Sequence, residues 1–300
     1  MAVREKDPVT GRYTTGHEWN GIKELDTRVP RVVTFFLVVT ILFSVVYWIL
    51  MPAWPTGTSY TAGLLGIDQH DSVERALERA ETERADWQAE LRSLELPEVV
   101  QRPELMRIVR EGGRSLFGDN CAVCHGTDGS GSPGYPDLAS GAFVWGGEPD
   151  TILETIRVGI NSAHPETRIA EMPGFRRDGV LNTQEVSAIV SFIRSNASDV
   201  GELSDRDESG VEEGHALFGE NCASCHGEDA RGMQEVGGPD LLDGNWIYGG
   251  DRATLFASIA DGRRGHMPHW ENRLSERELR MLALYVVDLS SRDEVVASHD

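Results

Sequence analysis

The sequence predicts a mainly α-helical chain with one membrane-spanning helix near its N-terminus and two similar small domains in tandem after it. Three observations predict this class: an uncharged apolar run, an internal repeat, and apolar positions at helical spacing in both copies of the repeat. A length of 300 residues suits about two folded domains. We expect a cytoplasmic segment at 1–31, an anchor at 32–51, a periplasmic linker at 52–100, and domains at 101–199 and 200–300.

The apolar run at 32–51 carries no charge and is long enough to cross a bilayer as a helix. Pro52 and Pro55 mark its end. A cleaved signal peptide would not have so long a segment before its apolar stretch, so we expect an uncleaved anchor. Three basic residues shortly precede the run: Lys23, Arg28 and Arg31. The next basic residue is Arg75, and this bias predicts a cytoplasmic N-terminus and a periplasmic remainder at a bacterial inner membrane.

Two connecting segments differ in character. Residues 68–98 are rich in charge and alanine and predict one amphipathic helix, although Arg84 interrupts its apolar seam. The apolar residues at heptad spacing are Val73, Leu77, Ala80, Trp87, Leu91 and Leu94. This stripe would pack on a partner subunit, on the following domains or on the membrane surface. The polar, acidic stretch at Asn196–Gly210 is expected to link the two domains.

The internal repeat covers whole domains. Residues 113–121 match 214–222, residues 136–138 match 239–241, residues 145–147 match 248–250, and residues 181–193 match 274–286. A period near one hundred residues suits duplication of a domain rather than a solenoid. In the first copy Gly113, Phe117 and Cys121 share one face of a predicted helix, where the glycine would let another helix approach closely.

Further helices follow in each copy. Middle helices are expected to start near Pro149 and near Arg252. The last helices open with capping signatures, Asn182 with Glu185 and Ser275 with Glu278. The apolar residues behind these caps recur at helical spacing: Val186, Ile189, Val190 and Ile193 in the first copy, and Leu279, Leu282 and Val286 in the second.

Each copy contains one C-x-x-C-H motif, at residues 121–125 and 222–226, and together the motifs use all four cysteines. This motif is the attachment site of c-type haem. The cysteines Cys121, Cys124, Cys222 and Cys225 would form thioethers, and the histidines His125 and His226 would ligate iron. A zinc site would need its ligands closer together, and a redox dithiol would need a βαβ context that is not visible. The sequence therefore predicts two covalent haem c groups.

Haem of this kind usually takes a methionine as its other axial ligand, and this ligand raises the reduction potential. Met172 and Met267 are each followed by proline and lie shortly before a predicted last helix, so we expect them to be the axial ligands. Met281 lies inside a predicted helix and suits a core position better. Histidines that would compete are His164 in the first domain, and His266 and His269 in the second.

The helix order, with the haem motif after the first helix, resembles the class I cytochrome c fold, in which the first and last helices of a domain cross. The N-terminal segment adds a more specific resemblance. Residues 17–26, His-Glu-Trp-Asn-Gly-Ile-Lys-Glu-Leu-Asp, and the Pro-Ala-Trp-Pro at 52–55 flank the anchor. This pattern resembles the di-haem subunit III (CcoP/FixP) of cbb3-type cytochrome c oxidases, and the order of motifs agrees over nearly the whole chain.

The resemblance implies an electron-transfer subunit of a terminal oxidase. Such a subunit accepts electrons from a cytochrome c donor and passes them to a mono-haem subunit, which supplies the haem–copper subunit that reduces oxygen and pumps protons. The chain would have no catalytic centre of its own. Its N-terminal block and anchor would dock it to the complex and to membrane lipid.

Two other classes share the haem motifs: a free membrane-anchored di-haem cytochrome that shuttles electrons, and the cytochrome subunit of a periplasmic dehydrogenase. Neither explains residues 17–26. The formal net charge of −21 argues against nucleic acid as a partner, because phosphates would be repelled. An acidic surface suits a basic protein partner, and it also suits solubility in a salty habitat.

Overall fold

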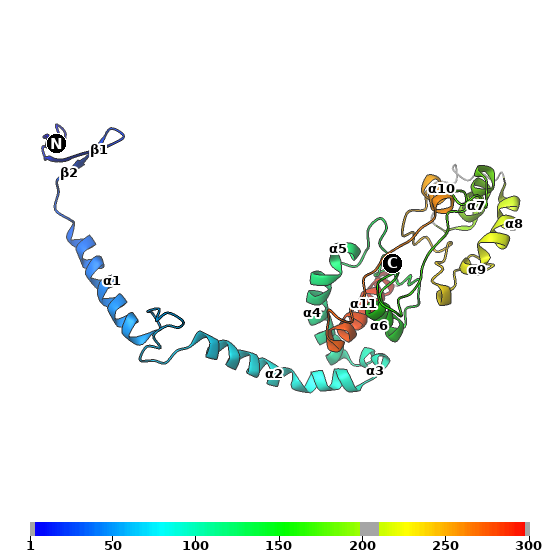
Figure 1. Cartoon of the computed structure of the whole chain (residues 1–300), viewed down its shortest axis with the longest axis horizontal. Helices are drawn as coiled ribbons and strands as arrows, with labels where there is room; N and C mark the ends of the chain where they lie inside the picture. Colours follow the sequence, from blue (N-terminus) through cyan, green and yellow to red (C-terminus); the bar gives the residue numbers. More distant parts are fainter. Residues whose placement is uncertain (1–3, 199–209, 298–300) are drawn as a thin grey trace. The chain divides into compact units, whose positions relative to one another are not determined.

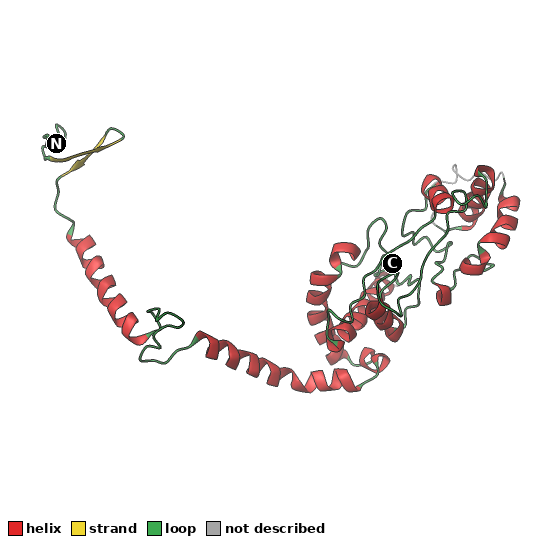
Figure 2. Ribbon diagram, in the orientation of Figure 1, coloured by secondary structure: helices red, strands yellow, loops and turns green. Residues whose placement is uncertain are grey.

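The computed structural model describes residues 4–198 and 210–297 and contains two compact units, residues 1–84 and 85–300. Figure 1 labels the elements along the chain, and Figure 2 shows that the second unit is built from helices and loops. A mainly α-helical class is therefore confirmed. Most of the expected linker at Asn196–Gly210 lies outside the described residues.

The first unit opens with a β-hairpin that the sequence analysis did not predict. Strands β1 (Thr14–Trp19) and β2 (Ile22–Leu25) pair antiparallel. Asn20 and Gly21 connect them with φ angles of 52° and 84°. Two consecutive positive φ angles define the two-residue turn that suits the twist of a hairpin, and Asn-Gly is its strongest sequence signal. That dipeptide is the signal that would have predicted the hairpin.

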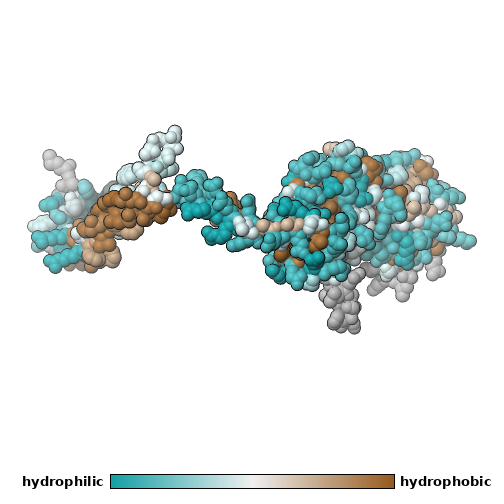
Figure 3. All heavy atoms as spheres, turned by 90° about the horizontal axis from the view of Figure 1, so that it is seen from below, coloured by the Kyte–Doolittle hydropathy of each residue, from teal (hydrophilic) through white to brown (hydrophobic). Residues whose placement is uncertain are grey.

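Helix α1 (Arg31–Leu50) confirms the predicted anchor. Among the described residues it is the one helix that is both long enough and apolar enough to cross a membrane. None of its side chains is buried. Figure 3 shows its apolar side chains as an exposed brown surface. Its hydroxyl groups bond within the helix: Thr40 Oγ1 donates to the Phe36 carbonyl at 2.9 Å, and Ser44 Oγ to the Thr40 carbonyl at 2.9 Å. These bonds satisfy polar groups that lipid cannot.

Helix α2 (Gln69–Ser93) confirms the predicted amphipathic helix, but its apolar stripe is buried only at the C-terminal end of the helix. Val73 and Leu77 are each 60% exposed, whereas Leu91 is buried. Near this end, Trp87 and Leu94 pack against the core of the second unit. A short helix, α3 (Leu96–Val100), follows and contacts α4. The end of the linker is therefore part of the second unit.

The two repeats contain corresponding helices, and the predicted starts of the middle helices are confirmed. The first repeat has α4 (Pro103–Asn120), α5 (Ala122–His125), α6 (Pro149–Val158) and α7 (Thr183–Asn196). The second repeat has α8 (Val211–Asn221), α9 (Ala223–His226), the short 3-10 helix η2 (Gln234–Val236), α10 (Arg252–Asp261) and α11 (Glu276–Ala297).

The long helices of the two repeats exchange partners. Helix α4 packs against α11, and α7 packs against α8. The expectation that the first and last helices of one repeat cross each other is therefore wrong: the first helix of each repeat packs on the last helix of the other. The predicted glycine contacts occur at these crossings. A Cβ on Gly113 would lie 2.7 Å from Tyr285 Cβ, and one on Gly214 would collide with the Ala188 carbonyl.

Two apolar cores result, and each draws on both repeats. The first contains side chains of α3, α4, α6 and α11, and the second contains side chains of α7, α8 and α10. Phe117 of α4 contacts Tyr285 of α11 in a tilted arrangement with ring centroids 5.6 Å apart, and the ring centroid of Phe218 of α8 lies 5.3 Å from that of Phe192 of α7. The boundary expected between residues 199 and 200 thus separates the sequence repeats but not the packed cores.

Both predicted caps occur. Asn182 and Glu185 form a reciprocal capping box at the start of α7, with the Asn182 side chain accepting from the Glu185 backbone N–H at 3.0 Å. At α11 the Ser275 backbone N–H donates to Glu278 Oε2 at 2.8 Å and the Ser275 hydroxyl donates to it at 2.6 Å. These bonds satisfy donors that a helix start leaves without partners.

Candidate haem-binding sites

Each C-x-x-C-H motif forms a one-turn helix directly after a long helix. Helices α4 and α8 end at Asn120 and Asn221, and α5 and α9 carry the motifs. The chain continues from one helix into the next, since the Cys121 N–H donates to the Phe117 carbonyl and the His125 N–H to the Cys121 carbonyl. A single turn therefore brings two thiols and an imidazole onto one short segment, as covalent attachment of a haem requires.

The two histidines have the same hydrogen-bond partner in each copy. His125 Nδ1 lies 3.1 Å from the Pro136 carbonyl oxygen, and His226 Nδ1 lies 3.0 Å from the Pro239 carbonyl oxygen. A donor at Nδ1 leaves the Nε2 lone pair available for a metal and holds the ring in one orientation. Burial lowers the pKa of both histidines, so both imidazoles are neutral at neutral pH.

The four cysteines are free thiols in the structure. Burial raises the pKa of Cys121 and of Cys222 to about 11, with a smaller contribution from the neighbouring cysteine of each motif. At neutral pH these two sulfurs therefore carry their protons.

Both motifs open into one cavity of about 730 Å³. Its lining includes His125, His226, Met172 and Met267 and is otherwise mostly apolar. One buried polar atom in the lining, Trp246 Nε1, has no hydrogen-bond partner. A haem has an apolar ring and two carboxylates, so it fits both an apolar lining and an indole N–H that needs an acceptor. The residues present therefore fit haem.

The two methionines lie on loops that exchange between the cores. Met172 packs against the core that contains Cys222, and Met267 packs against the core that contains Leu116 and Cys121. The backbone holds this exchange: Met172 pairs with Arg263 through hydrogen bonds of 2.9 and 3.0 Å, and Met267 pairs with Ile160 through two of 2.9 Å. Each methionine thus packs on the core that includes a cysteine of the other repeat's motif, which repeat symmetry alone did not predict.

The competing residues have other roles. His164 Nε2 lies 2.9 Å from Glu271 Oε2, and its ring lies 5.7 Å from that of His269. His266 lines the cavity next to Met267. Met281 is buried in the first core, where its sulfur lies close to Gly112. Of these residues, only His266 is therefore on the cavity wall.

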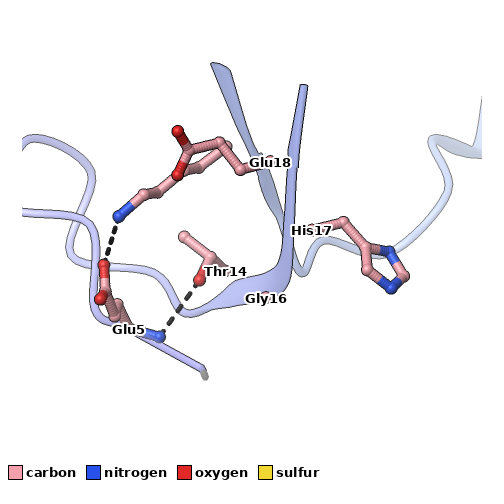
Figure 4. A pocket seen from close by; sticks show the side chains of 6 residues that line it. Glu5, Thr14, Gly16, His17 and Glu18 are labelled. Carbon is pink, nitrogen blue, oxygen red and sulfur yellow. Dashed lines mark hydrogen bonds and ion pairs between the residues drawn. The ribbon is translucent and has the colours of Figure 1, made fainter. Parts of the chain in front are cut away.

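The N-terminal hairpin carries a small polar hollow of about 170 Å³. Figure 4 shows Glu5, Thr14 and Glu18 around it and the His17 side chain on the other side of the strand. The Glu5 N–H donates to Thr14 Oγ1 at 3.1 Å, and Glu5 also pairs with Lys23. Within the described residues no group of three histidine, cysteine or acidic side chains is placed to hold a metal ion. The hollow lies between the hairpin and the segment that carries Glu5.

Known families match three parts of the chain. The family described as the N-terminal domain of cytochrome oxidase-cbb3, FixP, matches residues 11–58. The cytochrome c family matches residues 111–197, and the family described as cytochrome c oxidase, cbb3-type, subunit III matches residues 209–286. The matches follow the two sequence repeats and the segment around the anchor.

Relatives that align over almost the whole chain point to the same family as these matches. The cbb3-type cytochrome c oxidase subunit FixP of Bradyrhizobium sp. (strain ORS 278) is 42% identical over 95% of this chain and 97% of its own length. The CcoP subunit of Azospirillum brasilense is 39% identical over 96% of this chain and 99% of its own length. The CcoP subunit of Cereibacter sphaeroides is 38% identical over 91% and 93%.

Two helical repeats, each with a haem-attachment motif, behind an apolar anchor define a membrane-anchored cytochrome c. The agreement with relatives over almost the whole length narrows this class. The chain belongs to the FixP/CcoP family of cbb3-type cytochrome c oxidase subunits.

Proposed function

We propose that this chain carries two covalent haem c groups and passes electrons from a cytochrome c donor to the mono-haem subunit of its oxidase, which supplies the haem–copper catalytic subunit. The observation that carries the proposal is that both C-x-x-C-H motifs and both expected methionine ligands line one cavity. Two haems in one cavity would lie close enough for direct exchange. The relatives named as cbb3-type oxidase subunits support the choice of complex.

Eight residues would hold the haems: Cys121, Cys124, Cys222 and Cys225 as thioether links, and His125, His226, Met172 and Met267 as axial ligands. The haem iron supplies the redox chemistry when bound. The proline carbonyls hold each imidazole in the orientation that presents Nε2 to the cavity. The apolar walls exclude water, which favours the reduced form and raises the reduction potential.

The exchanged loops determine which ligands would meet. The packing favours His125 with Met267 at the first haem, and His226 with Met172 at the second. Residues 101–199 and 200–300 would then be two attachment repeats whose haem sites are completed by each other.

In the membrane, residues 1–31 would lie in the cytoplasm and the haem sites in the periplasm. The support is the basic residues before α1 and the location of covalent haem attachment outside the bacterial inner membrane. Residues 17–26, which form most of the hairpin, would contact the other oxidase subunits or the membrane surface. Such contacts need no chemistry from the hairpin, whose hollow is mainly polar.

The experiment is mild solubilisation of membranes followed by capture of this chain through a C-terminal tag. We expect co-purification of b-type haem, copper and cyanide-sensitive oxygen uptake. A matched variant without residues 4–26 keeps α1 and should retain both haems but lose the other subunits. Capture of a di-haem protein alone, under conditions that keep other respiratory complexes intact, would instead favour a free electron shuttle.

A further inference from the structure

The loops before the two methionines each place an arginine over an aromatic ring. Arg168 Cζ lies 4.8 Å from the centroid of Trp145, and Arg263 Cζ lies 4.5 Å from that of Tyr248. The partners correspond in the repeat, because each ring belongs to an aromatic-Gly-Gly segment and each arginine lies four residues before its methionine. The same cation–π pair is therefore built twice in one chain.

The two loops reach this arrangement by different backbones. Arg263 directly follows Gly262, the residue after α10, whereas Arg168 comes nine residues after Gly159, the residue after α6. The longer loop folds back, so the Arg168 N–H donates to the Gly159 carbonyl at 3.1 Å. The Asn161 side chain holds this loop in place, because its Nδ2 donates to two backbone carbonyls at 2.7 Å. The guanidinium therefore occupies an equivalent position in both repeats, although the loops that carry it differ.

Each arginine lies beside the backbone that holds one methionine. Arg263 itself pairs with Met172, the methionine of the second core. Arg168 forms a bridge with Ile160, and Ile160 pairs with Met267, the methionine of the first core. Each guanidinium in turn lies over an aromatic ring that lines the cavity, Arg168 over Trp145 and Arg263 over Tyr248.

Both guanidinium groups have N–H donors that are not fully used in hydrogen bonds. Arg168 Nε is buried without a hydrogen-bond partner, and its Nη2 makes only a long bond of 3.4 Å to the Thr151 carbonyl. Arg263 uses Nε to bond Ser258 Oγ at 2.9 Å and lines the cavity, whereas Arg168 lies over Trp145, which lines the cavity. Among the described residues neither arginine forms an ion pair with a carboxylate. A partly buried cation without an anion is unfavourable unless a ligand supplies one.

We propose that Arg168 and Arg263 bind the propionate carboxylates of the first and second haem, respectively, and raise the reduction potentials of the two haems. The inference rests on the proposed attachment of two haems. A planar guanidinium fits a carboxylate with two parallel hydrogen bonds, and the stacked ring holds its plane. A fixed positive charge beside the haem disfavours the oxidised iron, which carries one more positive charge, so the arginine raises the potential.

The test measures both midpoint potentials of the full-length, haem-loaded chain in detergent. We expect Arg263→Gln and Arg168→Gln each to lower one of the two potentials and the double variant to lower both. A tenfold change in the equilibrium between the redox forms, about 59 mV for one electron, is the expected size. The methionine-to-iron absorption band should remain. Arg231→Gln is the control, because it removes an exposed arginine that already pairs with the carboxylate of Asp240, unlike Arg168 and Arg263, which lie over aromatic rings.

Arg263→Lys separates charge from loop support, because it keeps the cation and loses the planar fork. We expect it to retain most of the wild-type potential. Shifts no larger than that of Arg231→Gln would overturn the proposal. Equal loss of the methionine band in Arg263→Gln and Arg263→Lys would also overturn it, because the side chain would then only support the loop. A wild-type chain without covalent haem would refute the proposed function instead.

Discussion

At the scale of single residues, the exchange of methionines is the main consequence of the structure. The sequence places Met172 and Met267 at equivalent positions, and either could complete either site by chemistry alone. The backbone pairs Met172–Arg263 and Met267–Ile160 carry each methionine to the other core. The ligands of one haem would therefore come from residues about 140 positions apart at the first site and 54 apart at the second.

The ligand exchange predicts which haem each methionine serves. In a chain whose first motif is disabled by Cys121→Ala and Cys124→Ala, we expect Met172→His to abolish the remaining methionine-to-iron band. Met267→His in the same background should leave that band in place. The measurement is the oxidised absorption spectrum at the red end. The reverse result would mean that each repeat uses its own methionine.

In the intact chain the same substitutions have a simpler expected result. Met172→His or Met267→His should each reduce the methionine-to-iron band to about half and lower one reduction potential, because histidine replaces the ligand that raises it. Met281→Leu is a matched control, since this methionine is buried in the first core away from the cavity lining. A band unchanged by both histidine variants would remove these methionines as ligands.

At the scale of helices, two glycines of α4 predict opposite effects of substitution by alanine. Gly113→Ala would place a methyl group 2.7 Å from Tyr285 Cβ, so we expect it to cost about 1–3 kcal/mol of unfolding free energy. Gly118→Ala, in the same helix with nothing within 4 Å, should instead stabilise by up to about 1 kcal/mol. Denaturant unfolding followed by haem absorbance compares the two. Similar effects would contradict the α4–α11 crossing.

The α11 cap predicts a dependence on pH. Hydrogen bonds from Ser275 lower the pKa of Glu278 below its usual 4.5. A lowered pKa in the folded state contributes stability above the unfolded value, and that stability is lost as pH falls through the folded value. Ser275→Ala should cost about 1 kcal/mol at pH 7. The cost should shrink below pH 4.5, and unfolding curves at several pH values would measure it.

A control separates the charge of Glu278 from its hydrogen bonds. Glu278→Gln keeps an acceptor for the Ser275 N–H but cannot titrate. In that background the cost of Ser275→Ala should not change between pH 7 and pH 4. A cost that still declines with acid would place the titrating group elsewhere.

At the scale of the whole molecule, the two cores are not independent domains. Helix α4 needs α11, and α7 needs α8, so each core is incomplete within one sequence repeat. A protease site inserted among residues 199–209 tests this dependence. After cleavage we expect the two fragments to remain associated, with both haems unchanged, in gel filtration without denaturant. Separation into two folded mono-haem fragments would contradict the exchange.

Much of this protein follows from local patterns in the sequence. The anchor, the haem motifs, the caps of α7 and α11 and the family all depend on residues close together in the chain, where spacing dictates chemistry. The hairpin at Asn20-Gly21 was missed although its turn signal is also local. That signal indicates backbone structure, whereas the resemblance of residues 17–26 to a known block indicates only a docking role.

The sequence by itself predicts that two haems attach at Cys121–His125 and Cys222–His226, behind one membrane anchor. Only the tertiary structure decided how the helices pair. Both first helices carry the same glycine and phenylalanine spacing, and both last helices present a similar apolar face, so local pattern allows either pairing. The choice is made by contacts between distant segments, such as Gly113 with Tyr285 and Met172 with Arg263. Those contacts depend on long-range packing that no local spacing encodes.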